Sequence, residues 1–282
     1  MKKSTKTVKA FNGSRKSSFV KNQGSNALLT STAVATRLGV TASTVKRWAD
    51  DGTLPHVRTA GGHRRFLLRD VDDFANPPQV EVNNWVEKLT SGTGTYGIRS
   101  MLLEERDKKG SYARVMKTVS QVLAAIGQKW SNGDLTIHEE HFASARLIRA
   151  LAQLSDTYVS YDSGPTRLLT VPELEEHTIG LSMLEICLRE LGWEVSWLGV
   201  KTPKDSLIKA ILSGNYQAVA LSASANYKYP ELLEGYVTDL ETICEQTNTM
   251  LWLGGDAPWP KSSPYATRMH DFDSLPHART LL

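Results

Sequence analysis

Three short segments in the second half of the sequence carry the residues best suited to chemistry. In the first, Glu175-Glu176-His177-Thr178-Ile179-Gly180, the carboxylate of Glu175 could accept a hydrogen bond from one imidazole nitrogen of His177. That bond would set the tautomer and strengthen the ring as a metal ligand, and Gly180 would let the backbone approach something large and flat. Taken alone, a histidine on a loop is more often a solvated residue than a ligand.

The elements that must position these residues are strands. Apolar runs typical of strands are Leu168–Val171, Ala218–Leu221 and Met250–Leu253. His177 lies in the loop after the first run, Ser222 follows the second, and Gly254-Gly255 follow the third. A periodic apolar helix over 181–191 begins after the first loop, which predicts an open α/β sheet. Such sheets bind ligands at the carboxyl ends of their strands, so the three segments should meet at one edge.

In this order and spacing, the three segments resemble the cobalamin-binding domain shared by methionine synthase, the mutases and cobalamin-dependent regulators. The resemblance implies that His177 is the lower axial ligand of cobalt. It also implies that a Ser-x-Leu segment and a Gly-Gly pair line the slot for the displaced nucleotide tail. Here the middle segment reads Ser222-Ala223-Ser224, so its third position departs from the pattern. Glu175 is one methylene longer than the usual Asp.

Charge is distributed unevenly along the chain. Residues 1–70 contain fourteen Lys or Arg and three Asp or Glu, although the net charge of all 282 residues is only +3. A basic amino-terminal part favours nucleic acid as its partner. Residues 1–27 contain no acid and few apolar side chains, which predicts a disordered basic tail that either contacts phosphates or only aids solubility.

Residues 28–75 have the pattern of two short helices around a glycine turn, followed by a cation-rich hairpin. Thr30 or Ser31 can cap the first helix, whose expected inner face is Ala33, Val34 and Leu38. Thr41 or Ser43 can cap the second helix, with Val45 and Trp48 facing inward. This stretch resembles the winged helix-turn-helix DNA-binding domain of MerR-type regulators, through its Ser-Thr-Val-Lys-Arg-Trp helix, Gly-x-Leu-Pro turn and Gly-Gly-His-Arg-Arg-Phe wing. The resemblance implies a double-stranded operator DNA partner, with part of the surface in the major groove and the wing on phosphates or in the minor groove. The expected DNA-binding residues are Ser43, Thr44, Lys46, Arg47, Arg58, His63, Arg64 and Arg65.

Residues 79–156 contain four helical segments, which predicts a four-helix bundle. The third segment, 112–130, is strongly periodic and ends at Trp130. In the fourth, the expected inward stripe runs through Ile137, Glu140/His141, Ser144, Ile148 and Leu151. Two ionisable residues near an apolar seam are either solvated on the rim of the bundle or positioned for a ligand.

Trp130, followed by Glu140 and His141 and then by the corrinoid segments, resembles the CarH/LitR class of light-responsive cobalamin repressors. That class implies that Trp130, Glu140 and His141 cover the adenosyl group of adenosylcobalamin. It also implies a tetramer on DNA in the dark that light dissociates, often at promoters for carotenoid synthesis. Some relatives have a histidine directly after the tryptophan. Here that residue is Ser131, so after light the cobalt would bind water or another histidine, such as His138 or His141.

The predicted fold class is thus multidomain α and α/β. A winged helix-turn-helix is followed by a four-helix bundle and then by a Rossmann-like (flavodoxin-like) domain over 167–282. No apolar run approaches the length of a membrane span, and two cysteines, Cys187 and Cys244, are too few for a disulfide framework, so we expect a cytoplasmic protein. We expect a regulator and not an enzyme. The alternatives are a light-independent sensor of a corrinoid or other tetrapyrrole, and a corrinoid carrier for a methyltransferase.

Overall fold

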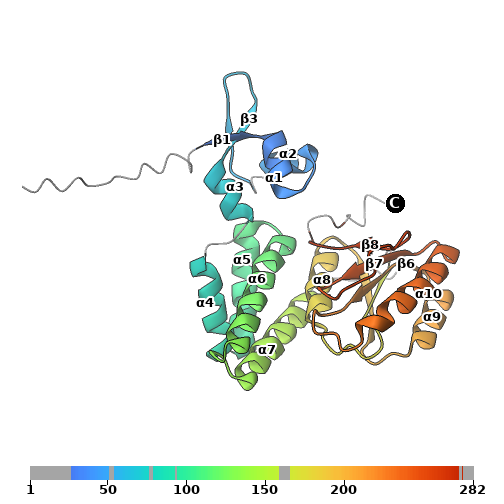
Figure 1. Ribbon diagram of the computed structural model, residues 1–282. Helices are drawn as coiled ribbons and strands as arrows, with labels where there is room; N and C mark the ends of the chain where they lie inside the picture. Colours follow the sequence, from blue (N-terminus) through green and yellow to red (C-terminus); the bar gives the residue numbers. More distant parts are fainter. Residues whose placement is uncertain are drawn as a thin grey trace, which may run out of the picture. The chain divides into compact units, whose positions relative to one another are not determined.

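The computed structural model describes residues 27–50, 54–75, 79–92, 94–158, 166–272 and 275. The chain divides into two compact units, 1–75 and 76–282, and each is described by itself (Figure 1). The predicted basic tail, 1–27, lies outside the described residues except for Ala27, and residues 76–78 and 159–165 lie outside them as well. Among the helices that the structure describes, none combines the length and hydropathy needed to cross a membrane.

The first unit is a three-stranded antiparallel sheet with three helices. Its elements are β1 (Leu28–Thr30), α1 (Ser31–Leu38), α2 (Ala42–Asp50), β2 (Val57–Arg58), β3 (Arg64–Leu67) and α3 (Leu68–Ala75). The strand order is β1-β3-β2, and the β2–β3 hairpin is the wing. Val34, Val45, Trp48 and Phe66 form its core with Ala35, Ala49, Leu54 and Val71.

Local capping explains where the two central helices begin. Thr30 caps α1 by accepting a hydrogen bond from the backbone N–H of Ala33, and Thr41 accepts one from Thr44 at the start of α2. Gly39 ends α1 in the left-handed conformation, which a glycine adopts at little cost. As predicted, Val45 and Trp48 face inward. Ala33, which the helical pattern placed on the inner face of α1, is exposed, and Ala35 is buried instead.

The second unit begins with four helices. They are α4 (Gln79–Thr90), α5 (Gly94–Lys109), α6 (Tyr112–Ser131) and α7 (Ile137–Ser155). On α6 the predicted stripe is buried from Tyr112 to Ile126, apart from the partly buried Leu123, but Trp130 at its end is 46% exposed.

The predicted inward stripe of α7 is correct at Leu151 but wrong at its amino-terminal end. The buried positions of α7 are Ala143, Leu147, Ala150, Leu151, Leu154 and Ser155. Ile137 is 58% exposed, and the His141 side chain is 70% exposed. The buried face of α7 contains the small residues Ala143 and Ala150, which allow close packing but do not stand out as an apolar stripe in the sequence. The core stripe is therefore rotated away from Glu140 and His141.

The remainder of the second unit is a five-stranded parallel sheet with helices on both faces. The elements are β4 (Thr166–Thr170), α8 (Ile179–Glu190), β5 (Glu194–Gly199), α9 (Lys204–Ser213), β6 (Tyr216–Ser222), the 3₁₀ turn Pro230–Leu232, α10 (Leu233–Gln246), β7 (Met250–Gly254) and β8 (Thr267–Arg268). The strand order β5-β4-β6-β7-β8 reverses direction between β4 and β6. This is the flavodoxin-like order, in which ligands bind at that switch point.

Figure 1 shows α8 on one face of the sheet and α9 and α10 on the other. The outer surface of α8 packs against α6 and α7, so one hydrophobic core runs through the bundle and that side of the sheet. Glu190, at the end of α8, accepts hydrogen bonds from Arg106 of α5 (2.9 Å) and from the backbone N–H of Tyr112 (2.7 Å). The sheet therefore sits against the bundle through both apolar packing and a carboxylate at the first turn of α6.

Candidate functional site

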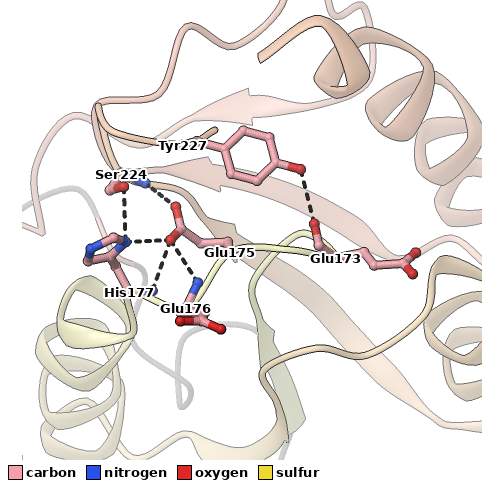
Figure 2. A network of polar contacts seen from close by, with 6 residues as sticks. All are labelled: Glu173, Glu175, Glu176, His177, Ser224 and Tyr227. Atoms are coloured by element: carbon pink, nitrogen blue, oxygen red, sulfur yellow. Dashed lines mark hydrogen bonds and ion pairs between the residues drawn. The ribbon is translucent and has the colours of Figure 1, made fainter. Parts of the chain in front are cut away.

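The carboxylate of Glu175 organises the loop between β4 and α8 (Figure 2). One oxygen, Oε1, accepts hydrogen bonds from the backbone N–H groups of Glu176 (2.8 Å) and His177 (2.9 Å), and it lies 2.6 Å from Nδ1 of His177. The other oxygen, Oε2, accepts the backbone N–H of Ser224 (2.8 Å), which follows β6. We call Glu175, His177 and Ser224 the histidine corner.

The charge state of Glu175 decides the tautomer of His177. Burial by itself would raise the pKa of Glu175, whose side chain is 2% exposed. The hydrogen bonds from His177 and Ser224 outweigh that effect and hold the pKa below the usual range of glutamate. An ionised carboxylate only accepts hydrogen bonds, so Nδ1 carries the proton, and in the neutral imidazole Nε2 then keeps the lone pair. The His177 side chain is 61% exposed, so Nε2 can reach a metal outside the protein surface.

The predicted residues of the other two strands do reach the same edge. Ser222, the last residue of β6, is in register with Gly254, the last residue of β7. A Cβ at Gly180 would lie 2.9 Å from Oγ of Ser222, and one at Gly255 would lie 2.2 Å from the carbonyl oxygen of Ala223. At Gly255 the contact is with backbone, so that position requires glycine, whereas at Gly180 a Cβ would displace the side chain of Ser222. Ser224, which stands where the family pattern has leucine, contacts the site: its Oγ lies 3.2 Å from Nδ1 of His177.

Sequence reasoning missed two residues that brace the Gly254-Gly255 turn. The indole N–H of Trp259 donates to the carbonyl of Gly254 (2.9 Å). The guanidinium of Arg268 donates to the carbonyls of Leu253 (2.6 Å) and Gly255 (3.0 Å). Trp259 lies in the Pro-rich segment after β7 and Arg268 in the two-residue strand β8, where neither periodicity nor spacing marks them, so only the folded chain reveals their role.

A cleft of about 410 Å³ opens beside His177. Loops after β4, β5 and β6 line it, including Leu174, Glu176, Lys201 and Tyr229. Lys201 forms an ion pair with Glu176 at 2.8 Å. Tyr227 donates its hydroxyl hydrogen to the carbonyl of Glu173 at 3.0 Å and so ties the β6 loop to the β4 loop (Figure 2).

The three residues expected above a cofactor lie on the bundle. Glu140 and His141 contact each other on α7 at 2.6 Å, and Ser144 donates to the second oxygen of Glu140 at 2.6 Å. Trp130 is half exposed near the end of α6. These polar contacts stay within α7, so the covering of a cofactor by Trp130, Glu140 and His141 remains a prediction. Ser131 donates to the carbonyl of Gln128 at 2.9 Å.

The first unit carries a basic surface formed by α2 and the wing. Ser43, Lys46 and Arg47 are exposed on α2, and Thr44 is partly exposed. A groove of about 310 Å³ is lined by Thr30, Ser31, Thr32, Lys46, Gly62, His63, Arg64 and Arg65. Asp50, at the end of α2, pairs with Arg64 and, at 3.6 Å, with Arg58. Only 19% of the Arg64 side chain is exposed, and its ion pair with Asp50 links the wing to α2.

Comparisons with known proteins match both the first unit and the sheet-containing part of the second unit. Residues 28–77 match the family model of the helix-turn-helix domain, and residues 166–259 match that of the B12 binding domain. The chain has the domain composition of CarH-like helix-turn-helix repressors. It is 28% identical over 177 residues to the HTH-type transcriptional repressor CarH of Myxococcus xanthus, an alignment that covers 61% of this chain and 58% of that protein.

A second CarH-like relative is the HTH-type transcriptional repressor CarA of Myxococcus xanthus, which is 36% identical over 103 residues, 36% of each chain. The chain thus spans less than two thirds of the length of these curated relatives. Both are repressors, in agreement with the expectation that the chain is not an enzyme.

The solved structures support the fold. The monomethylamine corrinoid protein of Methanosarcina barkeri superimposes with a TM-score of 0.50 at 14% identity, covering 72% of this chain and 95% of that one. At that identity the similarity concerns the fold alone. The predicted fold class is confirmed: an amino-terminal helix-turn-helix, a helical middle and a parallel five-stranded cobalamin-binding domain.

The histidine corner fits a B12 cofactor on chemical grounds. Cobalt would be held by Nε2 of His177, the one nitrogen of that ring which the corner leaves unbonded. Its partner nitrogen already has the carboxylate that histidine ligands of metals usually have.

Proposed function

We propose that this protein is a transcriptional regulator that binds operator DNA through residues 28–75 and adenosylcobalamin through residues 167–282, with residues 79–156 covering the cofactor. The observation that carries the proposal is the histidine corner on the same chain as an exposed basic α2 and wing. A carrier for a methyltransferase would need the first feature but has no use for the second.

The cofactor would supply a cobalt–carbon bond that light cleaves. Within the chain, His177 would hold the cobalt from below, with Ser222, Ser224, Gly180, Gly254 and Gly255 along the tail of the cofactor. On the other side, Trp130 offers an exposed aromatic face and Glu140 a carboxylate suited to a ribose hydroxyl pair. His141 would orient Glu140 through the 2.6 Å contact between them.

The regulatory step would be a change of assembly. Helix-turn-helix modules read palindromic sites as dimers or larger assemblies. A ligand that binds better to the assembled state raises operator affinity through linkage. We propose a dark tetramer on DNA that dissociates when light removes the adenosyl group, giving repression in the dark, with carotenoid or other photoprotective genes as targets.

A second function is favoured by Ser131. This residue follows Trp130, and its hydroxyl is occupied by the carbonyl of Gln128. With serine in place of histidine, position 131 offers no nitrogen that could bind the cobalt after light removes the adenosyl group. A regulator that senses a corrinoid or another tetrapyrrole without responding to light is the alternative.

Gel-shift measurements with a DNA fragment from the gene's own promoter region distinguish these functions. Wild-type protein with adenosylcobalamin should shift the fragment in the dark and release it after green light. With methylcobalamin it should shift weakly or not at all. His177→Ala, which removes the cobalt ligand but leaves the basic surface unchanged, should bind as the cofactor-free protein does under both conditions. A shift indifferent to light but dependent on cobalamin would establish the alternative.

A further inference from the structure

A tight turn next to the histidine corner contains a leucine in a conformation that leucine avoids. The backbone N–H of Glu175 donates to the carbonyl of Pro172 at 2.9 Å, which closes a four-residue turn over 172–175. Leu174, the third residue of the turn, has a φ of 77°. A turn of this kind favours glycine at that position, because a side chain there crowds the backbone.

The turn explains the backbone angle but not the leucine. A glycine at position 174 would form the same turn and present Glu175 in the same way, without strain. Nor does core packing explain the residue, because the Leu174 side chain is 50% exposed. A large apolar side chain is thus held in solvent on a strained backbone, two residues before Glu176 and three before His177.

The location of the strain points to a ligand. Among the residues that the structure describes, the non-glycine residues with positive φ are Leu174, Lys201 and Asn248. Two of these three, Leu174 and Lys201, line the 410 Å³ cleft beside His177. Strained residues of this kind concentrate at ligand-binding sites, where contacts with the ligand compensate for them.

We propose that Leu174 is a binding residue, whose side chain packs against the apolar surface of a macrocycle whose metal is held by His177. This rests on the proposed cobalamin binding. Tyr229, which is 41% exposed, lines the same cleft and offers a second apolar surface. In the absence of ligand, the Leu174 side chain only adds backbone strain. Its apolar contact forms when the ligand binds, and that contact compensates for the strain.

This role predicts effects of opposite sign on stability and on binding. Leu174→Gly relieves the backbone strain, so the cofactor-free protein should melt at a higher temperature. The same substitution deletes the apolar contact, so the dissociation constant for hydroxocobalamin should rise by about ten-fold, the effect expected for most of one leucine side chain. A residue with a merely structural role would change both in the same direction.

Three further variants separate strain from contact. Leu174→Ala keeps the strained angle and removes the contact, so it should weaken binding without raising the melting temperature. Leu174→Met keeps an apolar side chain and should bind nearly as wild type does. Asn248→Gly relieves a comparable angle, φ 53°, just before β7 and thus at the opposite edge of the sheet. It should raise the melting temperature and leave the dissociation constant unchanged.

The experiment is thermal denaturation of the full chain without cofactor, paired with absorbance titration by hydroxocobalamin in the dark. Weaker binding by both Leu174→Gly and Leu174→Ala, with a raised melting temperature only for Leu174→Gly, supports the proposal. Unchanged binding by both variants overturns it while leaving the proposed function intact. A wild-type protein that binds no hydroxocobalamin overturns both, since Leu174 would then have no such ligand to contact.

Discussion

The basic surface of α2 and the wing in the first unit and the histidine corner of the second unit are built in different ways. In the first unit, the exposed cations lie on a helix and a hairpin close together in sequence, and a groove open to solvent separates them. In the histidine corner, Glu175 accepts a hydrogen bond from Ser224, 49 residues further along the chain. Directly beside the corner, Gly255 approaches Ala223 from a third loop. A charged surface can lose one cationic side chain and keep most of its affinity for an anion. In a close-packed polar corner, the loss of one side chain leaves its hydrogen-bond partners without a substitute.

The largest expected contrast comes from two glycines with nearly the same backbone angle. Gly255 (φ 74°) would place a Cβ 2.2 Å from the carbonyl oxygen of Ala223, whereas Gly62 (φ 77°) in the wing has open space around it. Gly255→Ala should destabilise the second unit by roughly 2–5 kcal/mol through strain and overpacking together. Gly62→Ala should lower the stability of the first unit by only about 1 kcal/mol through backbone strain. Urea denaturation of each variant measures both, and equal losses would remove the contrast.

The next largest effect should follow from replacing Glu175 by Gln. The amide can accept at one atom only, so at least one backbone N–H of Glu176, His177 or Ser224 loses its partner in a buried site. We expect a loss of about 2–3 kcal/mol in the free energy of unfolding and weaker cobalamin binding. Glu176→Gln, which removes only an exposed pair with Lys201, is the matched control and should leave the denaturation midpoint unchanged.

The pH dependence of stability tests the same carboxylate. Because the pKa of Glu175 is lower in the folded state than in the unfolded state, its contribution to stability is present above the unfolded value of about 4.3. That contribution is lost as the pH falls through the folded pKa. Wild-type protein should therefore lose more stability on acidification below about pH 4 than Glu175→Gln does, as thermal denaturation across pH 3–7 would reveal. Parallel curves for the two proteins would contradict the assignment.

Loss of one cation from α2 should have a moderate effect on DNA binding and none on the histidine corner. Lys46→Ala or Arg47→Ala should weaken operator binding by about ten-fold at moderate salt. If the lost contact is to a phosphate, the slope of log affinity against log salt should also fall by roughly 0.9. Fluorescence anisotropy over a range of salt concentrations gives both values, and the cobalamin spectrum provides the control. Affinity unchanged at every salt concentration would exclude that residue from the interface.

The smallest effect should come from the side chain of Ser224. Its backbone N–H holds Glu175, and its hydroxyl only approaches His177 at 3.2 Å. Ser224→Ala should therefore change the dissociation constant for cobalamin by no more than about three-fold, which corresponds to less than 1 kcal/mol. Ser224→Pro removes the N–H and should weaken binding far more. If Ser224→Ala were as damaging as Ser224→Pro, the hydroxyl and not the backbone would be the important group.

Local patterns predicted much of this protein correctly. The sequence offered two candidate caps for each of the first two helices, and Thr30 and Thr41 are the ones that accept the hydrogen bonds. These caps, the inward Val45 and Trp48, and the strands that lead to His177, Ser222 and Gly254 all depend on neighbours a few residues away. On α7 periodicity identified Leu151 but missed Ala143 and Ala150, because these two alanines are buried without the large apolar side chains that mark a core stripe. It also could not show that Trp130, at the end of its stripe, is half exposed.

By itself, the sequence determined the order of the elements, the exposed basic helix α2 and the edge of the sheet where His177 lies, since these follow from local spacing and from the geometry of parallel strands. Only the tertiary structure decided how that edge is held together. It placed the backbone of Ser224 on Glu175, Trp259 and Arg268 on the Gly254-Gly255 turn, and Leu174 in a strained turn beside the cleft. The physical reason is that these contacts join loops far apart in the chain, and no pattern within one loop records which partner it will meet.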